Sequence, residues 1–243
     1  MARVFVDQNI VSYGDTLNGE RRNGVIGYVR KAPPQEGKQR EQFDCLPTIS
    51  QLASIGEIKL GRYIELCFED WSRAGSFPVN DLGNLFHPKT MTLVKPAIER
   101  SYFASSSSPF YLKNSALVDF CLWLNTPGLE KLLLGQEISC DFPETMKTNI
   151  SELDRYRFLC KGLSPKQCVD AFHFWSAEVN EFDFFLTMDG KFRNAMTDTK
   201  KTISNCSIVF PSELLERLDI TYRKDFEFEE GYFYGIGGNK LYV

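Results

Sequence analysis

The chain has 243 residues, of which 43% are hydrophobic and 25% charged, proportions that are typical of a globular protein and exclude a disordered or collagen-like chain. A formal net charge of −4 and a pI near 5.4 argue against a protein that grips long duplexes through bulk positive charge. Two histidines and seven scattered cysteines argue against a zinc site and indicate buried thiols in a reducing cytoplasm. No apolar segment is long enough to span a bilayer, so we expect no membrane contact.

The first part of the chain predicts strands and helices around a polar excursion. Residues 3–6 form an apolar strand that runs directly into Asp7. Residues 14–42 are polar and contain Gly and Pro, which indicates an exposed loop with a β-ribbon at residues 24–30. The residue pattern then predicts a helix at 46–55 with Pro47 in its first turn, a strand at 57–63, a helix at 64–71 and loops over 72–110.

The rest of the chain predicts a helical region followed by two more strands. Residues 112–136 form an amphipathic helix or a helix pair broken at Pro127-Gly128, and residues 148–161 form another helix. Ser164 followed by Pro165 is typical of a helix start. The remaining predicted elements are the helix that continues to residue 179, strands at 183–187 and 206–210, a last helix at 211–218 and a β-hairpin within 221–243.

This alternation of strands and helices predicts an α/β fold with a central, mostly parallel sheet and helices on both faces. We expect a main domain over residues 1–220, interrupted by insertions at about 14–42 and 75–148. A C-terminal extension over residues 221–243 would follow it.

The candidate chemical groups are acidic side chains. Asp7 and Asp189 each follow a predicted strand, and the binding site of such a sheet lies at the carboxyl ends of its strands. Glu65 and Glu69 share a helix face because they are four residues apart, and Asp170 lies on a later helix. If these carboxylates meet, two charges about 4 Å apart at an effective dielectric constant near 20 repel by roughly 4 kcal/mol, so the cluster needs a cation. Oxygen ligands favour Mg²⁺ or Mn²⁺, which can activate water against a phosphodiester.

Four segments, in this order along the chain, carry a resemblance to a known family. Residues 4–9 read V-F-V-D-Q-N, an apolar strand followed by Asp-x-Asn, and residues 170–177 read D-A-F-H-F-W-S-A, a helix with an Asp, then a His, then a small residue. Residues 183–189 form a strand that ends in Thr-x-Asp, and residues 207–213 form a closing strand, a Pro and a helix start. These segments resemble PIN-domain nucleases. The matching parts of the chain are roughly residues 1–12, 46–71 and 151–217, less than half of it.

By this resemblance, the catalytic and metal-binding acids would be Asp7, Asp170, Asp189 and Glu69. The fourth acid of the family lies on the helix after the second strand, and Glu65 is the second choice for it. At the end of that strand Tyr63 stands where the family usually has Ser or Thr. Asn9 and Thr187 would orient the acids, and His173 would be a hydrogen-bonding neighbour of the site. The candidates for phosphate contacts just past the site are Lys191 and Arg193.

The resemblance implies a PIN-like endoribonuclease that needs Mg²⁺ or Mn²⁺ and hydrolyses single-stranded RNA. It further implies a toxin of a toxin–antitoxin pair or another bacterial RNA-processing protein. Its partners would be RNA and an antitoxin or another protein, and a homodimer is left open. Two alternatives stay open: a non-catalytic interaction module whose insertions bind a protein, and a DNA-directed nuclease with the same site.

Each motif also has a structural interpretation. Asp189-Gly190 is a common turn pair of β-hairpins. Asp170 and His173 could form the solvated face of an amphipathic helix, and Glu65 and Glu69 could be ordinary surface charges. The nuclease interpretation rests on the order and phase of all four segments together.

Overall fold

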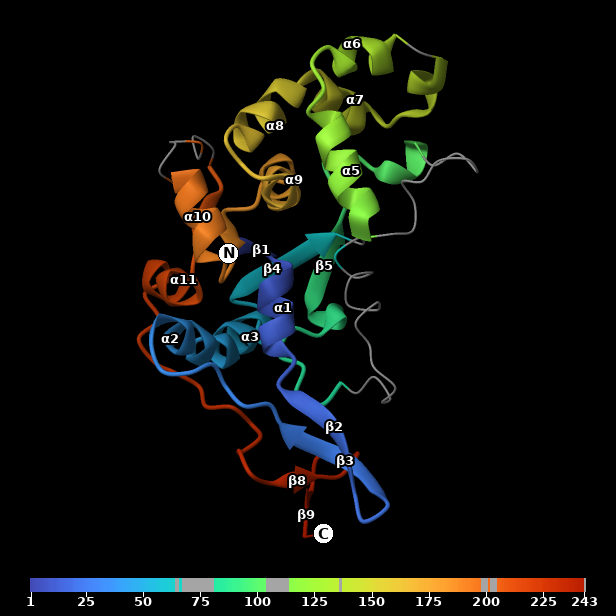
Figure 1. Ribbon diagram of the computed structural model, residues 1–243. Helices are drawn as coiled ribbons and strands as arrows, with labels where there is room; N and C mark the ends of the chain where they lie inside the picture. Colours follow the sequence, from blue (N-terminus) through green and yellow to red (C-terminus); the bar gives the residue numbers. More distant parts are fainter. Residues whose placement is uncertain are drawn as a thin grey trace. The chain divides into compact units, whose positions relative to one another are not determined.

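The computed structural model describes residues 1–63, 66, 81–103, 114–135, 137–197, 201 and 205–242. Within these residues the chain forms a five-stranded parallel sheet with helices around it and a second, antiparallel sheet (Figure 1). The predicted α/β fold class is therefore confirmed. The strands of the parallel sheet, in spatial order, are β5 (Met91–Val94), β4 (Ile58–Tyr63), β1 (Ala2–Val6), β6 (Phe184–Leu186) and β7 (Ser207–Val209).

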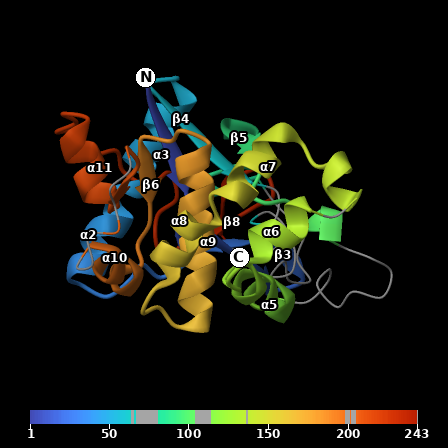
Figure 2. The ribbon, with the colours of Figure 1, turned by 90° about the horizontal axis from the view of Figure 1, so that it is seen from above.

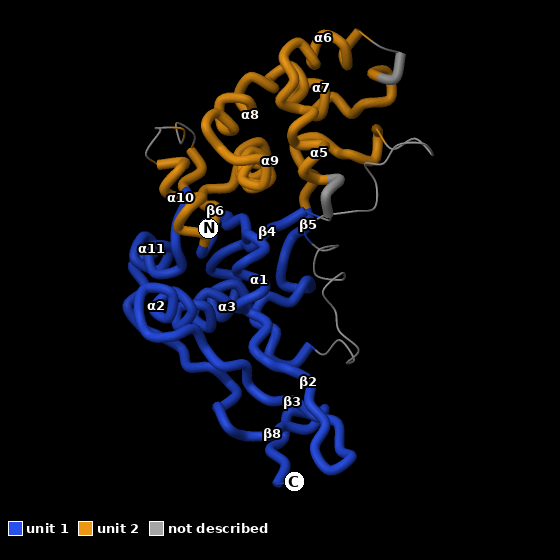
Figure 3. The backbone as a smooth tube through the Cα atoms, in the orientation of Figure 1, with its two compact units in different colours: residues 1–93, 186–188, 208–243 blue, residues 94–185, 189–207 orange. Residues whose placement is uncertain are grey.

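The chain divides into two compact units, drawn in different colours in Figure 3. Unit 1 contains Met1–Leu93, Leu186–Met188 and Ile208–Val243. Unit 2 contains Val94–Phe185 and Asp189–Ser207.

The core of unit 1 is built on β1. Val4, Phe5 and Val6 are all fully buried, so both faces of the strand are covered, as is usual in a parallel sheet. β1 pairs in parallel with β4, and Phe5 lies opposite Gly61. Three helices pack against one another in unit 1, as Figures 1 and 2 show: α2 (Lys38–Asp44), α3 (Leu46–Ser54) and α11 (Pro211–Arg217).

The second sheet joins the two predicted β-hairpins of unit 1. Its spatial order is β2 (Leu17–Arg22), β3 (Val25–Arg30), β8 (Phe233–Tyr234) and β9 (Lys240–Leu241). Asn23 and Gly24 connect β2 to β3 with φ angles of 46° and 83°, the positive values that a two-residue hairpin turn needs. The ribbon predicted at residues 24–30 is part of a longer hairpin that begins at Leu17. The predicted terminal hairpin is present as β8 and β9, and β3 pairs with β8. A small core lies on this sheet, formed by Leu17, Tyr28, Phe228 and Tyr234.

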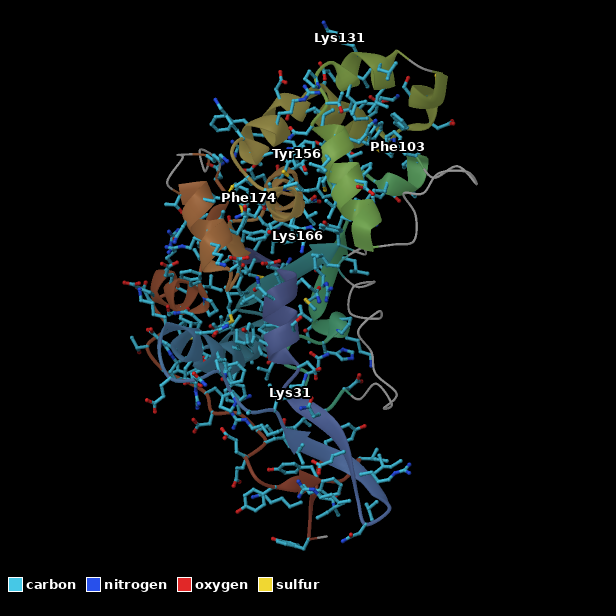
Figure 4. All side chains as sticks on the ribbon, viewed as in Figure 1. Lys31, Phe103, Lys131, Tyr156, Lys166 and Phe174 are labelled. Atoms are coloured by element: carbon cyan, nitrogen blue, oxygen red, sulfur yellow. The ribbon has the colours of Figure 1, made fainter. Side chains whose placement is uncertain are left out.

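Unit 2 is mainly helical. Its longest helix, α9 (Pro165–Val179), begins at the predicted cap: the Ser164 hydroxyl accepts from the backbone N–H of Gln167, and the Gln167 side chain accepts from the backbone N–H of Ser164. Tyr156, labelled in Figure 4, packs on Phe172 and Trp175 of α9. The other helices are α5 (Asn114–Leu124), α6 (Leu129–Leu134), α7 (Glu144–Ser151), α8 (Leu153–Cys160) and α10 (Gly190–Thr197). Short 3₁₀ turns occur at Pro88–Thr90 in unit 1, and at Arg100–Phe103 and Glu137–Asp141 in unit 2.

The structure corrects several predicted elements. The helix predicted over 148–161 is two helices, because Glu152 leaves helical geometry at φ −102° and ψ 19°. The predicted loop over 14–42 contains β2 and the start of α2, and the predicted loop over 72–110 contains β5. In both places a short helix or strand is flanked by Gly, Pro or Ser residues. Because these residues are typical of loops, the sequence pattern predicted a loop. Of the helix predicted over 64–71 only Leu66 is described, so that prediction lies outside the described residues.

Candidate functional site

Asp7 lies where β1 ends and α1 (Gln8–Gly14) begins, and the residue is 6% exposed. Its backbone N–H donates to the carbonyl oxygen of Leu186, the last residue of β6, at 3.0 Å. Its Oδ1 accepts from the backbone N–H of Gln8 at 2.7 Å, which caps the first turn of α1. The chain thus places a buried carboxylate at the carboxyl ends of two neighbouring parallel strands.

The second oxygen of Asp7 is held by two other side chains. Oδ2 accepts from the Thr187 hydroxyl at 2.6 Å and from Asn9 Nδ2 at 2.5 Å. Asn9 Nδ2 also donates to Thr187 Oγ1 at 2.9 Å, and its Oδ1 accepts from the backbone N–H of Met188 at 2.9 Å. We call Asp7, Asn9 and Thr187 the carboxylate network. It joins three residues that the sequence analysis assigned to one site, and it holds the carboxylate in one orientation.

A buried arginine that the sequence analysis did not select lies next to this network. Arg62, on β4, is 1% exposed, and its Nη2 donates to Gln8 Oε1 at 3.2 Å. Gln8 is the residue whose backbone N–H binds Asp7. The sequence signal was a charged residue inside a strand predicted to be largely buried, where Arg is rare unless it is paired.

Five of the predicted residues belong to unit 2. Asp170 and His173 both lie on α9, as their spacing predicted, and His173 is 3% exposed. Asp189 Oδ1 accepts from the backbone N–H groups of Lys191 at 2.8 Å and Phe192 at 2.9 Å, so it caps the start of α10. The hairpin-turn interpretation of Asp189-Gly190 is therefore wrong. Lys191 is exposed and Arg193 partly exposed, and both lie on α10.

None of these contacts places the metal ligands predicted from sequence at one site. Asp7 belongs to unit 1, whereas Asp170 and Asp189 belong to unit 2, and Glu65 and Glu69 lie outside the described residues. In the ranges that the structure describes, no three His, Cys, Asp or Glu side chains are grouped to hold a metal ion. Asp7 and its neighbours offer the oxygen atoms that Mg²⁺ prefers, but the described residues do not supply a full set of ligands.

Unit 1 also contains a charged cavity of about 600 Å³. Among the residues that line it, Arg40 forms an ion pair with Asp44, and the Arg30 guanidinium lies 4.3 Å from the centre of the Phe226 ring. Burial raises the pKa of the Cys45 thiol that lines it. The sequence analysis missed this cavity because its lining comes from segments far apart in the chain: Arg30, Arg40, Glu41, Asp44, Cys45, Arg223, Lys224, Asp225, Phe226 and Glu229. Its four cationic and four anionic side chains balance, so the lining favours neither sign of ligand.

Among the helices of the described part, none combines the length and the apolar character that a bilayer-spanning segment requires. Comparison of the chain with protein-family models, with curated proteins and with solved structures finds no significant match.

Proposed function

We propose that this protein is a metal-dependent nuclease that hydrolyses phosphodiester bonds of single-stranded RNA. The observation that carries the proposal is the carboxylate network at the ends of β1 and β6. Capping of α1 requires only Oδ1 of Asp7, so the cap does not account for the two side chains that hold Oδ2. One of these is Thr187, 180 residues further along the chain. A buried, oriented carboxylate at this edge of a parallel sheet is typical of a binding site.

The proposal keeps the predicted metal ligands, which are Asp7, Asp170, Asp189 and Glu69, with Glu65 as the alternative to Glu69. A bound Mg²⁺ or Mn²⁺ ion would supply an activated water and would offset the phosphate charge. Asn9 and Thr187 keep the Asp7 carboxylate in place, which reduces the reorganisation that ligand binding costs. Lys191 and Arg193 would contact the phosphates of the substrate strand.

The proposed biological role is that of a toxin of a toxin–antitoxin pair or of another RNA-processing enzyme, related to the PIN-domain nucleases. An antitoxin or another protein would then be its partner. All cysteines among the described residues are free, which suits the reducing cytoplasm where such an enzyme would act.

Cleavage of a labelled single-stranded RNA in the presence and absence of Mn²⁺ tests the proposal. We expect cleavage that needs the metal and that falls roughly 100-fold or more in Asp7→Asn and in Asp189→Asn. Asp183→Asn is the matched control, because Asp183 is an exposed acid just before β6 begins, and we expect it to keep full activity. Circular dichroism of each variant checks that the fold is retained.

A parallel reaction with single-stranded DNA of the same sequence separates the alternatives. Cleavage of DNA alone would replace the proposal with a DNA-directed nuclease. Absence of cleavage, together with no heat of Mn²⁺ binding in calorimetry, would favour a non-catalytic interaction module and contradict the proposal.

A further inference from the structure

The charged cavity of unit 1 has the size of a small-molecule site. Its volume of about 600 Å³ lies within the range of about 300–1,000 Å³ that is usual for such sites. Its walls come from the end of β3, from α2 with the residue that follows it, and from residues 223–229. No residue of the carboxylate network lines it, so its ligand can be studied separately from the proposed nuclease.

Flat groups are stacked where the cavity is lined by Phe226 and Arg30. The Phe226 ring stacks on the Phe43 ring, with 4.7 Å between the ring centres and 19° between the ring planes. The Arg30 guanidinium lies over the Phe226 ring, and its Nη1 donates to the carbonyl oxygen of Phe228 at 3.0 Å. Because Phe43 and Arg30 cannot share one face of the ring, Phe226 lies between them. The second face of the guanidinium is then left for a flat ring of a ligand, which stacks well on Arg.

The charges of the lining balance when counted by residue, but they are not all paired with one another. Asp44 forms an ion pair with Arg40 at 2.9 Å. Glu229 forms an ion pair at 2.8 Å with Lys240, which does not line the cavity. These contacts occupy two of the four acids, so the other charged side chains decide which ligand fits.

Two exposed cations of the lining are available to an anion. The Arg223 guanidinium donates to the backbone carbonyl oxygen of Tyr222 at 3.1 Å rather than to a carboxylate. The backbone N–H of the next residue, Lys224, donates to the Thr48 hydroxyl at 2.9 Å, which attaches this segment to α3. Within the described part of the chain, neither Arg223 nor Lys224 forms an ion pair. Adjacent Arg and Lys side chains of this kind are suited to a phosphate group.

Two exposed acids, Glu41 on α2 and Asp225, line the same cavity and form no ion pair within the residues that the structure describes. They disfavour a ligand that is an anion throughout, and they can accept hydrogen bonds from hydroxyl groups, as acidic residues do from ribose. A metal ion does not fit beside the unpaired cations. An apolar ligand does not fit either, because most of the lining side chains are charged.

We propose that this cavity binds a ribonucleoside monophosphate, either free or as the phosphorylated first nucleotide of an RNA strand. The base stacks on the Arg30 guanidinium, Arg223 and Lys224 bind the phosphate, and the ribose hydroxyls donate to Glu41 and Asp225. This site does not depend on the proposed nuclease activity, because it uses neither a metal ion nor the carboxylate network.

Calorimetry of the full chain with adenosine monophosphate tests the proposal. The titration is done in EDTA, so that no divalent cation contributes to the heat. We expect saturable binding that weakens about tenfold or more in the double variant Arg223→Ala, Lys224→Ala. We expect a similar loss in Arg30→Lys, which keeps the charge but removes the flat group. Arg21→Ala is the matched control, because Arg21 is an exposed cation of β2 outside the cavity, and we expect it to bind like the wild type.

The proposal is overturned if millimolar adenosine monophosphate gives no saturable heat, or if the double variant binds as tightly as Arg21→Ala. The double variant changes two exposed side chains, so this outcome does not depend on whether Arg30→Lys folds. Ribose phosphate, which lacks the base, and deoxyadenosine monophosphate should both bind more weakly than adenosine monophosphate. Equal affinity for all three would contradict the assigned contacts to base and ribose.

A short RNA with and without a phosphate on its first nucleotide distinguishes the two sources of the ligand. Tighter binding of the phosphorylated RNA, lost in the double variant Arg223→Ala, Lys224→Ala, supports the end of an RNA strand as the ligand. Binding of the mononucleotide but of neither RNA supports a free nucleotide. Loss of RNA cleavage in Asp7→Asn with unchanged nucleotide binding is expected, because the two sites share no residue.

Discussion

The two oxygens of Asp7 perform different tasks. Oδ1 caps α1, whereas Oδ2 is held by Asn9 and Thr187. The sequence could predict that these three residues lie at strand ends, because each follows an apolar β-rich segment. It could not give the direction of Oδ2, which depends on β1 and β6 lying side by side, a contact between segments about 180 residues apart.

Removal of the Thr187 hydroxyl tests how strongly the network holds Asp7. Thr187→Val keeps the shape of a fully buried side chain but leaves Oδ2 with one donor fewer, so we expect a loss of about 1–2 kcal/mol in the free energy of unfolding. Urea unfolding measures this loss. Thr187→Ser keeps the hydroxyl and serves as the control for the donor. A Thr187→Val protein as stable as the wild type would contradict a structural role for this hydrogen bond.

The lowered pKa of Cys168 predicts a pH dependence of stability. The Cys160 thiol and the charge of Lys201 lower its pKa in the folded state to about 7, below the ordinary value of 9.0, so between these pH values the unfolded chain binds more protons and stability rises with pH. This gain is lost as the pH falls through 7. Urea unfolding in reducing buffer at pH 7 and pH 9 measures it. We expect Cys168→Ser to flatten the rise, and an equal rise in that variant would count against a Cys168 thiolate.

At the level of single elements, the sequence predicted the position of a helix or strand correctly where a helix cap or an apolar run marked it. Ser164 and Pro165 marked the start of α9, and the apolar run at 3–6 marked β1. The start of α10 was missed, because the cap supplied by Asp189 competes in sequence with the turn signal of Asp189-Gly190. The pairing of β3 with β8 was also missed, since nothing local to either hairpin specifies the partner of its free edge.

Gly27 shows what the pairing of β3 with β8 requires. A Cβ atom at this position would lie 2.4 Å from the carbonyl oxygen of Tyr234 and 2.6 Å from the Phe233 ring. We therefore expect Gly27→Ala to destabilise the protein by about 1–3 kcal/mol through overpacking. Gly237→Ala is the matched control, because the nearest atom to its Cβ would lie at an ordinary 3.7 Å. Thermal unfolding compares the two, and equal midpoints would contradict this account of the second sheet.

At the level of the whole molecule, the α/β class followed from the order of strands and helices, and the structure confirms it. The sequence did not predict the division into two units, because unit 1 consists of residues 1–93, 186–188 and 208–243, which come from both ends of the chain. The candidate acids also come from both units: Asp7 belongs to unit 1, and Asp170 and Asp189 belong to unit 2. Assignment of Asp7, Asp170 and Asp189 to one site therefore rests on the family resemblance and stays a proposal.

The central claim is that these carboxylates bind a divalent cation. A crystal structure determined with Mn²⁺, using anomalous diffraction at the manganese edge, tests it most directly. We predict an anomalous peak coordinated by Asp7, Asp170 and Asp189, with Glu69 or Glu65 as the fourth ligand. A structure with these carboxylates far apart and no manganese peak beside Asp7 would contradict the proposed nuclease.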